Sequence, residues 1–150
     1  MLADMPRGLA AAATLALAVV SCTSDPAASV RSADEPVPVL ALYPDRATHD
    51  ALVDGRLITA GRCVFLVGSD GAMYGLAWPA GRTRWDAATS EIVLGDSRAA
   101  IGEEVWVGGG PAALNAQRVN DPRWEWVNPP QVDCLGDNFW IASSISTEER

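Results

Sequence analysis

The sequence predicts an all-β domain with one short helix, built as a small OB-like barrel or alternatively as a β-sandwich. Two observations predict this class. From Leu52 onwards, short stretches with β-type patterning follow one another along the chain. Turn signals separate these stretches about every 8–12 residues, which is the spacing of small barrels and sandwiches. The 150 residues leave room for a single core.

The first three predicted strands form a meander. Residues 52–59 are the first strand, and a turn at residues 60–61 leads into residues 62–67. This second stretch is almost continuously apolar and therefore predicts a strand buried on both faces. Residues 68–71 predict a hairpin turn, because glycine there supplies positive φ. Residues 72–78 predict the third strand, with Tyr74, Leu76 and Trp78 on one face.

Further strands are predicted at residues 91–94 and 104–107. The glycines at 108–110 are expected to end the second of these in a tight turn. A phosphate-binding loop would instead need a helix with a Lys-Ser/Thr pair after the glycines, and Pro111 with two alanines follows. Pro111 is expected to open the short helix, which runs to Arg118, because proline is favoured at the first helical position.

The C-terminal part combines an irregular segment with a last strand. Residues 120–132 are rich in proline and tryptophan, and proline breaks the hydrogen bonding of a strand ladder. Residues 138–145 predict the closing strand, with Phe139, Ile141 and Ile145 on one face.

An apolar stretch precedes the domain. Residues 9–20 have the length of a signal-peptide core and are too short to span a bilayer. The stretch ends in Val19-Val20-Ser21-Cys22, which resembles the lipobox of bacterial lipoproteins. In that motif the thiol accepts the lipid, and the small residue before it gives the peptidase access. We therefore expect a signal peptide at 1–21 and acyl chains such as palmitate on Cys22. The alternative is an uncleaved hydrophobic helix with a chance cysteine.

The segment between the lipid and the domain is expected to be a flexible tether. Residues 23–37 consist largely of Ser, Ala, Asp, Glu and Pro, with almost nothing to bury. Residues 39–43 are apolar and suited to dock onto the domain. The expected organisation is therefore a lipidated cysteine and tether at 22–50, a β domain at 51–147 and a disordered tail at 148–150.

The cysteine count predicts a disulfide. Once Cys22 is assigned to lipid, Cys63 and Cys134 remain as an even pair in an oxidising compartment. The alternative is a metal or nucleophilic role, but the chain has no Cys-x-x-Cys motif and a single histidine, His49. The disulfide is the better interpretation.

The motifs of the first strands resemble those of small secreted lipoproteins of high-GC bacteria. The matching stretches are Gly55-Arg56-Leu57, Cys63-Val64-Phe65-Leu66 and Tyr74-Gly75-Leu76-Ala77-Trp78-Pro79-Ala80-Gly81. The resemblance implies a compact β domain. Because its motifs are packing and turn positions, it assigns no residue a catalytic role.

Composition excludes several chemistries. All 11 basic residues are arginine, so Schiff-base chemistry and lysine general bases are excluded. The net charge of -8 argues against a nucleic-acid partner, which needs clustered positive charge. His49 is the single histidine, and the chain has no Gly-x-Ser-x-Gly elbow, which disfavours a Ser-His-Asp triad.

Acidic residues are the remaining candidates for catalysis. A glycosidase needs two carboxylates that face one cleft, one of them with a raised pKa. The available acids are Glu103, Glu104, Asp121, Glu125, Asp133 and Asp137. Sequence spacing does not pair them, and the oxygen ligands of Asp133, Asp137 and Asn138 fit no EF-hand pattern for calcium. We therefore expect no catalytic residue, no metal and no cofactor.

Six tryptophans are the most unusual feature of the composition. Trp78, Trp106 and Trp140 lie in predicted strands and are expected to fill the core. Trp124 and Trp126, at positions i and i+2, share a face where the chain is extended.

Trp124 and Trp126 form a candidate ligand patch with Asp121, Glu125 and Asn128. In such a patch the indole rings stack on a pyranose and the polar groups take its hydroxyls. The alternative is that both tryptophans cover one end of the core.

Taken together, these features predict a lipid-anchored protein on the outer side of the cell membrane whose β domain binds a ligand or partner without catalysis. A cell-wall glycan or an envelope protein is the candidate partner. The alternatives are a small cell-wall glycan hydrolase using paired carboxylates and a structural spacer. Two facing acids in one cleft would favour the hydrolase, whereas an aromatic patch without such a pair would favour binding.

Overall fold

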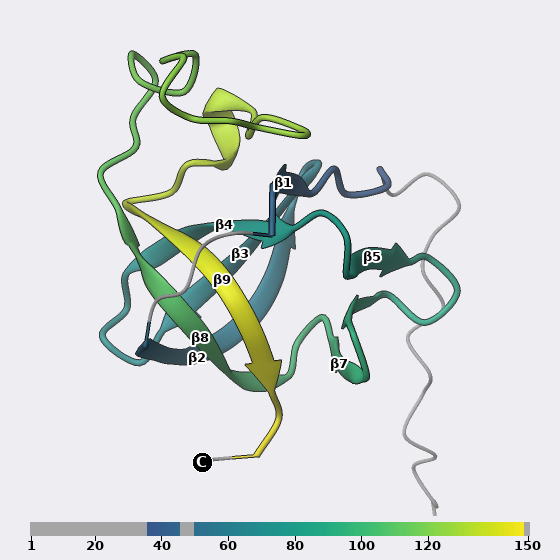
Figure 1. The fold of residues 1–150 in the computed structure, drawn as a ribbon. Coiled ribbons are helices and arrows are strands. Elements are labelled where there is room, and N and C mark those ends of the chain that lie inside the picture. Colours follow the sequence, from purple (N-terminus) through teal and green to yellow (C-terminus); the bar gives the residue numbers. More distant parts are fainter. Residues whose placement is uncertain (1–35, 46–49, 149–150) are drawn as a thin grey trace, which may run out of the picture. The chain divides into compact units, whose positions relative to one another are not determined.

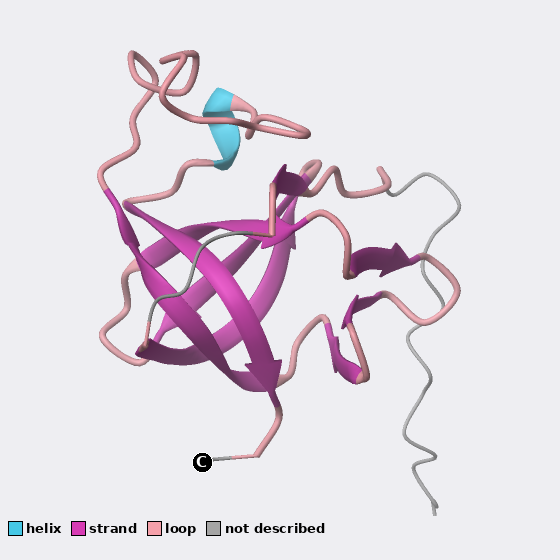
Figure 2. Cartoon of the chain, viewed as in Figure 1, coloured by secondary structure: helices cyan, strands magenta, loops and turns pink. Residues whose placement is uncertain are grey.

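The computed structural model describes residues 36–45 and 50–148, and over these residues the chain is all-β, as the sequence predicts. Strands and one turn of 3-10 helix follow one another along these ranges, as Figure 1 and Figure 2 show. Their bounds are β1 Ala41–Tyr43, β2 Ala51–Ala60, β3 Cys63–Gly68, β4 Met73–Pro79, β5 Thr83–Asp86, β6 Glu91–Leu94, β7 Ser97–Ala100, β8 Glu104–Ala112, η1 Val132–Cys134 and β9 Asn138–Ser146.

Five of the strands close into a barrel. β2, β3 and β4 form an antiparallel meander, and β8 pairs with the free edge of β2. β9 lies antiparallel to β8 and parallel to β4, with Phe139 opposite Gly75, which closes the ring (Figure 1). The order β2-β3-β4-β9-β8 is that of an OB-like barrel. The barrel prediction is therefore confirmed, and the sandwich alternative is wrong.

The barrel interior is filled by alternate side chains from all five strands. One from each strand is at most 1% exposed: Leu57, Leu66, Trp78, Val107 and Ile145. Successive side chains of a strand point to opposite faces, so every second residue enters the ring wherever the strand is regularly paired. Burying a side chain of this size stabilises the fold by about 1.5–3 kcal/mol.

A second, three-stranded sheet of β5, β6 and β7 covers the barrel core. Ile92 and Leu94 of β6 and Ala99 of β7 are buried in the same cluster as the barrel interior, and Trp85 of β5 packs against it. The sequence predicted β6 with its observed bounds but missed β5 and β7. These two strands are short and rich in polar residues, so their local pattern is weak.

The glycine run lies inside β8 rather than in a turn. β8 continues through residues 108–110 to Ala112 and pairs with β9 as far as Phe139. A Cβ at Gly109 would lie 2.0 Å from the carbonyl oxygen of Ile141, so glycine allows the two strands to approach. The predicted helix at 111–118 is therefore wrong, because Pro111 is paired within the sheet and a turn follows it.

A bulge in β9 changes which residues face the core. Gly108 lies opposite Ser144 but Gly109 lies opposite Ala142, so β9 has one extra residue at this point. Beyond the bulge, Ile145 points into the barrel interior, whereas Phe139 and Ile141 belong to a separate cluster. The prediction that these three side chains share a face is wrong for that reason.

The domain begins before residue 51. β1 pairs in parallel with the end of β4, and the Val39 N–H donates to the Arg62 carbonyl at 2.8 Å. The docking expected for residues 39–43 is therefore present, and this part of the predicted 22–50 tether belongs to the sheet. Cys22, His49 and the predicted signal peptide lie outside the described residues.

Cys63 and Cys134 form a disulfide, with their Cα atoms 5.2 Å apart, as predicted. The bond joins the start of β3 to η1. Phe65 and Met73 pack around it. β4 passes directly beneath, where a Cβ on Gly75 would lie 2.3 Å from the Cys134 carbonyl oxygen.

The tryptophans expected in the core divide into two groups. Trp78 and Trp140 are buried in the barrel interior, which confirms that part of the prediction. Trp106 is half-buried on the outside, because its neighbours Val105 and Val107 point inward.

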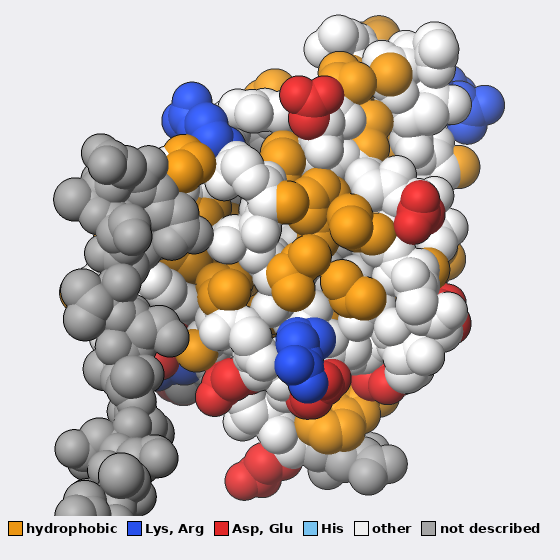
Figure 3. Space-filling view, turned by 180° about the vertical axis from the view of Figure 1, so that it is seen from behind, with side chains coloured by type: hydrophobic (Ala, Val, Ile, Leu, Met, Phe, Trp, Pro, Cys, Tyr) orange, Lys and Arg blue, Asp and Glu red, His pale blue; other side chains and the backbone are white. Residues whose placement is uncertain are grey.

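On the surface, apolar side chains gather over the middle of the face seen in Figure 3, with charged groups around them.

Candidate functional site

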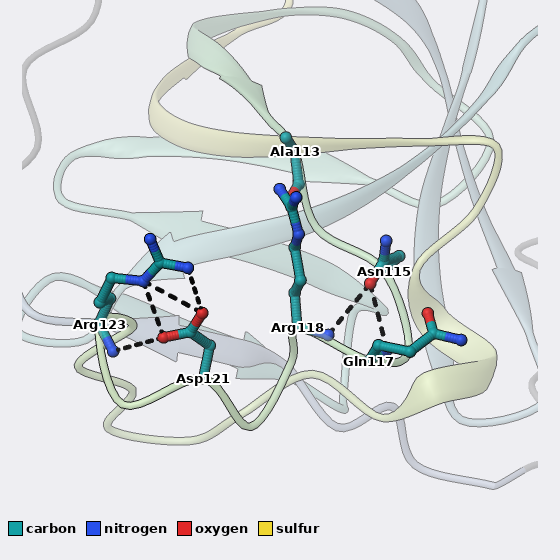
Figure 4. Close-up of polar contacts among 6 residues, drawn as sticks. All are labelled: Ala113, Asn115, Gln117, Arg118, Asp121 and Arg123. Carbon is teal, nitrogen blue, oxygen red and sulfur yellow. Dashed lines mark hydrogen bonds and ion pairs between the residues drawn. The ribbon is translucent and has the colours of Figure 1, made fainter.

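The long connection between β8 and β9, residues 113–137, carries the predicted ligand patch, and we call it the tryptophan loop. Figure 1 shows it rising from the barrel, and η1 is its only helical turn among the residues described. Its first bend is closed by the Asn115 side-chain oxygen, which accepts the N–H groups of Gln117 at 3.1 Å and Arg118 at 3.0 Å (Figure 4). Asparagine is suited to such turns because its short side chain reaches the backbone two residues on.

A second bend is closed by Asp121 and Arg123. The Asp121 carboxylate accepts the Arg123 backbone N–H at 3.0 Å and the guanidinium Nε at 3.0 and 3.1 Å (Figure 4). These hydrogen bonds, with the positive charges of Arg123 and then Arg118, lower the pKa of Asp121 to about 2. The carboxylate is therefore ionised and already bound at neutral pH.

The returning half of the loop is attached to β1. Leu42 and Asn128 exchange backbone hydrogen bonds of 2.7 and 3.0 Å, and the Asn128 side-chain N–H₂ donates to the Leu40 carbonyl at 2.7 Å. The loop is thus fixed at its far end by η1 and the disulfide and in its middle by β1.

Between these attachments, Trp124 and Trp126 stack on each other. Their ring centroids are 5.4 Å apart and their planes differ by 15°. Trp126 also meets Phe139 edge to face at 6.2 Å, and its indole N–H donates to the Val119 carbonyl at 2.9 Å. Both rings are half-buried and pack against the buried cluster that contains Phe139 and Ile141, so the alternative that they cover one end of the core holds in part. Trp126 has in addition the hydrogen bond that anchors it to the loop.

A cleft of about 470 Å³ opens beside the stacked pair. This size is in the range of small-molecule sites, which are usually apolar with a few polar groups. Among the described residues that line the cleft, two are charged, Arg123 and Glu125. The lining residues are Tyr43, Pro44, Pro111, Ala112, Ala113, Arg123, Trp124, Glu125, Trp126 and Ile141.

The structure separates the members of the predicted patch. Trp124, Trp126 and Glu125 line the cleft. Asp121 lies outside that lining, with its carboxylate held by Arg123. Asn128 does not line the cleft either, because its side chain ties the loop to β1.

Several lining residues were missed by sequence reasoning because they come from distant segments. Tyr43 ends β1 and donates its hydroxyl to the Ala142 carbonyl at 2.7 Å. Burial, followed by the nearby charge of Asp45, raises the pKa of the Tyr43 hydroxyl, while Arg82 opposes the shift. The one signal in the sequence was the apolar character of residues 39–43 after a polar stretch.

Two of the remaining acidic candidates, Glu104 and Asp137, make contacts away from the cleft. Glu104 pairs with Arg56 at 2.7 Å, and the Asp137 carboxylate accepts the Met73 N–H at 3.0 Å. Within residues 36–45 and 50–148, no group of three or more His, Cys, Asp or Glu side chains is placed to hold a metal ion. Glu125 is the one carboxylate in the described lining of the cleft.

Comparison with protein families, with curated proteins and with solved structures found no significant match. Among the described residues, no helix has the length and apolarity needed to cross a membrane. The fold and the cleft together define the class: a small OB-like barrel with an aromatic cleft beside the loop that joins its fourth and fifth strands.

Proposed function

We propose that this chain is a lipid-anchored protein of the cell envelope whose β domain binds a saccharide without catalysis. The observation that carries the proposal is the stacked pair Trp124–Trp126, which forms one wall of an otherwise apolar cleft. Flat apolar rings match the apolar face of a pyranose. The Glu125 carboxylate and the Arg123 guanidinium at the edge supply an acceptor and donors for sugar hydroxyls.

The position of the cleft in the barrel supports the same proposal. OB barrels commonly bind oligosaccharides or oligonucleotides with the loops that include the connection between their fourth and fifth strands. The tryptophan loop is that connection here, since β8 and β9 are the fourth and fifth barrel strands. The net charge of -8 favours the saccharide over the nucleic acid.

The hydrolase alternative is less well supported by the cleft. Glycoside hydrolysis needs two carboxylates, one of which remains protonated to donate to the leaving group. Glu125 has no second carboxylate beside it in the described lining. Asp121, the nearest acid in sequence on the loop, has a pKa of about 2 and cannot serve as a general acid near neutral pH.

Membrane attachment is proposed through lipid on Cys22. The apolar stretch and Ser21 before Cys22 are the features that support it. Replacing Cys22 with Ala should leave unprocessed precursor or release the protein into the medium. Fractionation with lipid labelling measures this, and a lipid-labelled, membrane-bound Cys22→Ala protein would contradict the anchor.

Binding can be tested by titrating the protein with neutral cell-wall oligosaccharides, such as oligomers of N-acetylglucosamine. We expect quenching of tryptophan fluorescence and heat of binding by calorimetry. Trp124→Ala should abolish both, because it removes one of the two stacked rings that line the cleft. Trp106→Ala is the matched control, since Trp106 is also half-buried but lies on the outer face of β8, away from the cleft.

Stability separates a ligand contact from a core residue. If Trp124→Ala destabilises the domain by about 3–5 kcal/mol, Trp124 belongs to the core and the binding proposal fails. Absence of binding by the unaltered protein would leave the structural spacer as the better interpretation.

A further inference from the structure

A second cavity adjoins the cleft at the tryptophan loop. It measures about 270 Å³ and is lined by Ala113, Arg118, Arg123 and Trp124. Ala113, Arg123 and Trp124 also line the larger cleft, so the two spaces share a wall. Trp126 lines only the larger one. Trp124 is thus the ring that a ligand would meet in both spaces.

The two arginines of this second cavity differ in what they already bind. The Arg123 guanidinium is held by both oxygens of Asp121. The Arg118 guanidinium, by contrast, makes one hydrogen bond to the described residues, from Nη1 to the Ala113 carbonyl at 3.4 Å. Figure 4 shows the two side chains on separate parts of the loop, with Asp121 at Arg123 and not at Arg118.

Arg118 therefore keeps most of its hydrogen-bonding capacity. A guanidinium has five N–H donors in a planar fork that matches a carboxylate, and it stays protonated at any physiological pH. The Asn115 turn fixes the backbone of Arg118 in place, which limits the positions that the guanidinium can reach. A ring stacked on Trp124 in this cavity would present its substituents to that fork.

We propose that the second cavity is a subsite for a sugar that carries a carboxylate, with the pyranose ring on Trp124 and the carboxylate on Arg118. This inference rests on the proposed saccharide binding and deepens it, because it selects an acidic ligand over a neutral one. Arg123 does not perform this role, since Asp121 already neutralises it.

The test uses trigalacturonate and its methyl ester, which share one sugar backbone but carry charged carboxylates or neutral esters, titrated by calorimetry against the full-length protein. At low ionic strength the acid should bind about fivefold more tightly than the ester, the upper end for an exposed ion pair. The preference should shrink in 0.5 M salt because of screening. Arg118→Gln should remove the preference and leave the affinity for the ester unchanged.

Two variants act as controls. Arg84→Gln makes the same change of charge on β5, where Arg84 pairs with Asp86 and lies outside both cavities, and it should keep the preference. Arg118→Lys keeps the charge and should retain the salt-dependent part of the preference. The melting temperatures of both Arg118 variants should match that of the unaltered protein.

The outcomes separate this inference from the function on which it rests. Equal binding of acid and ester, or an Arg118→Gln variant that weakens both equally, would overturn the acidic subsite and leave saccharide binding in place. If neither ligand nor any neutral oligosaccharide binds, both proposals fail.

Discussion

The barrel carries two long connections, and they are ordered in different ways (Figure 2). Between β4 and β8 the chain folds into a three-stranded antiparallel sheet, with paired residues along β5, β6 and β7. That sheet buries Ile92 and Leu94 against the barrel core. Between β8 and β9, the tryptophan loop is ordered by the Asn115 turn, the Asp121–Arg123 pair and the stacked indoles.

The difference separates the region that stabilises the domain from the region of the proposed binding site. A sheet that turns its apolar side to the core satisfies its backbone and leaves little apolar surface for a ligand. A loop ordered by side chains satisfies its polar groups locally and can keep aromatic rings at a cleft. We therefore expect substitutions in the first connection to change stability, and substitutions in the second to change binding more than stability.

The largest effect should come from the disulfide, because it attaches the end of the tryptophan loop to the barrel. The Cys63→Ser, Cys134→Ser double variant should lose about 4 kcal/mol of unfolding free energy, from loop-closure entropy over a separation of 71 residues. Urea denaturation measures this. Native protein in which both thiols react freely with an alkylating reagent would contradict the bond.

Next in size is the sheet that covers the core. Ile92→Ala should cost about 3 kcal/mol, because it leaves a cavity at a fully buried position. Leu52→Ala is the control, since Leu52 is 53% exposed and its loss should cost under about 0.5 kcal/mol. Saccharide binding should persist in Ile92→Ala under conditions where the variant is folded. A loss below about 1 kcal/mol would show that the sheet does not cover the core.

Within the tryptophan loop, the two indoles should respond differently. Trp126→Ala should cost about 2 kcal/mol, less than a full core tryptophan because Trp126 is half-buried. Trp126→Phe should cost about 1 kcal/mol, since it keeps an aromatic ring but loses the hydrogen bond to Val119. Trp124→Ala should have the smallest effect on thermal stability of the three. The reverse order would assign the anchoring role to Trp124.

The smallest effect should be that of protonating Asp121, which breaks its contact with Arg123 at low pH. The pKa of Asp121 is lowered from 3.8 to about 2, so its contribution to stability is complete above about pH 4 and is lost as the pH falls towards 2. The NMR signals of the Arg123 guanidinium should therefore shift in that window. Asp121→Asn should remove the transition at Arg123, and a transition that persists in this variant would assign it to another carboxylate.

Several strands of the barrel and of the second sheet could be predicted locally. The strands near residues 52–59, 62–67 and 91–94 follow from short apolar stretches and from turns whose glycines are readable in the sequence. The helix predicted after Pro111 failed because pairing with β9 outweighs local propensity there. The prediction that Phe139 and Ile145 share one face failed because a bulge in β9 shifts the alternation of inward and outward side chains.

The site was predictable only where its residues are neighbours in the chain. Trp124, Glu125 and Trp126 are consecutive in the sequence, and their residue types indicated a candidate ligand patch. Tyr43 and Ile141 reach the same cleft from β1 and β9. Asn128 looked like a member of the patch because of its position, yet the carbonyl that it meets belongs to Leu40, far away in the chain.

By itself, the sequence determined the all-β class, the disulfide pair and the presence of unusual tryptophans in a segment broken by proline. These depend on residue types and near-neighbour spacing, which act locally. Tertiary structure decided that the glycines of β8 serve strand pairing, that Trp106 faces outward and that Trp124 stands between two cavities. Each of those outcomes depends on which sequence-distant segment lies against the residue. Closure of the barrel determines that arrangement.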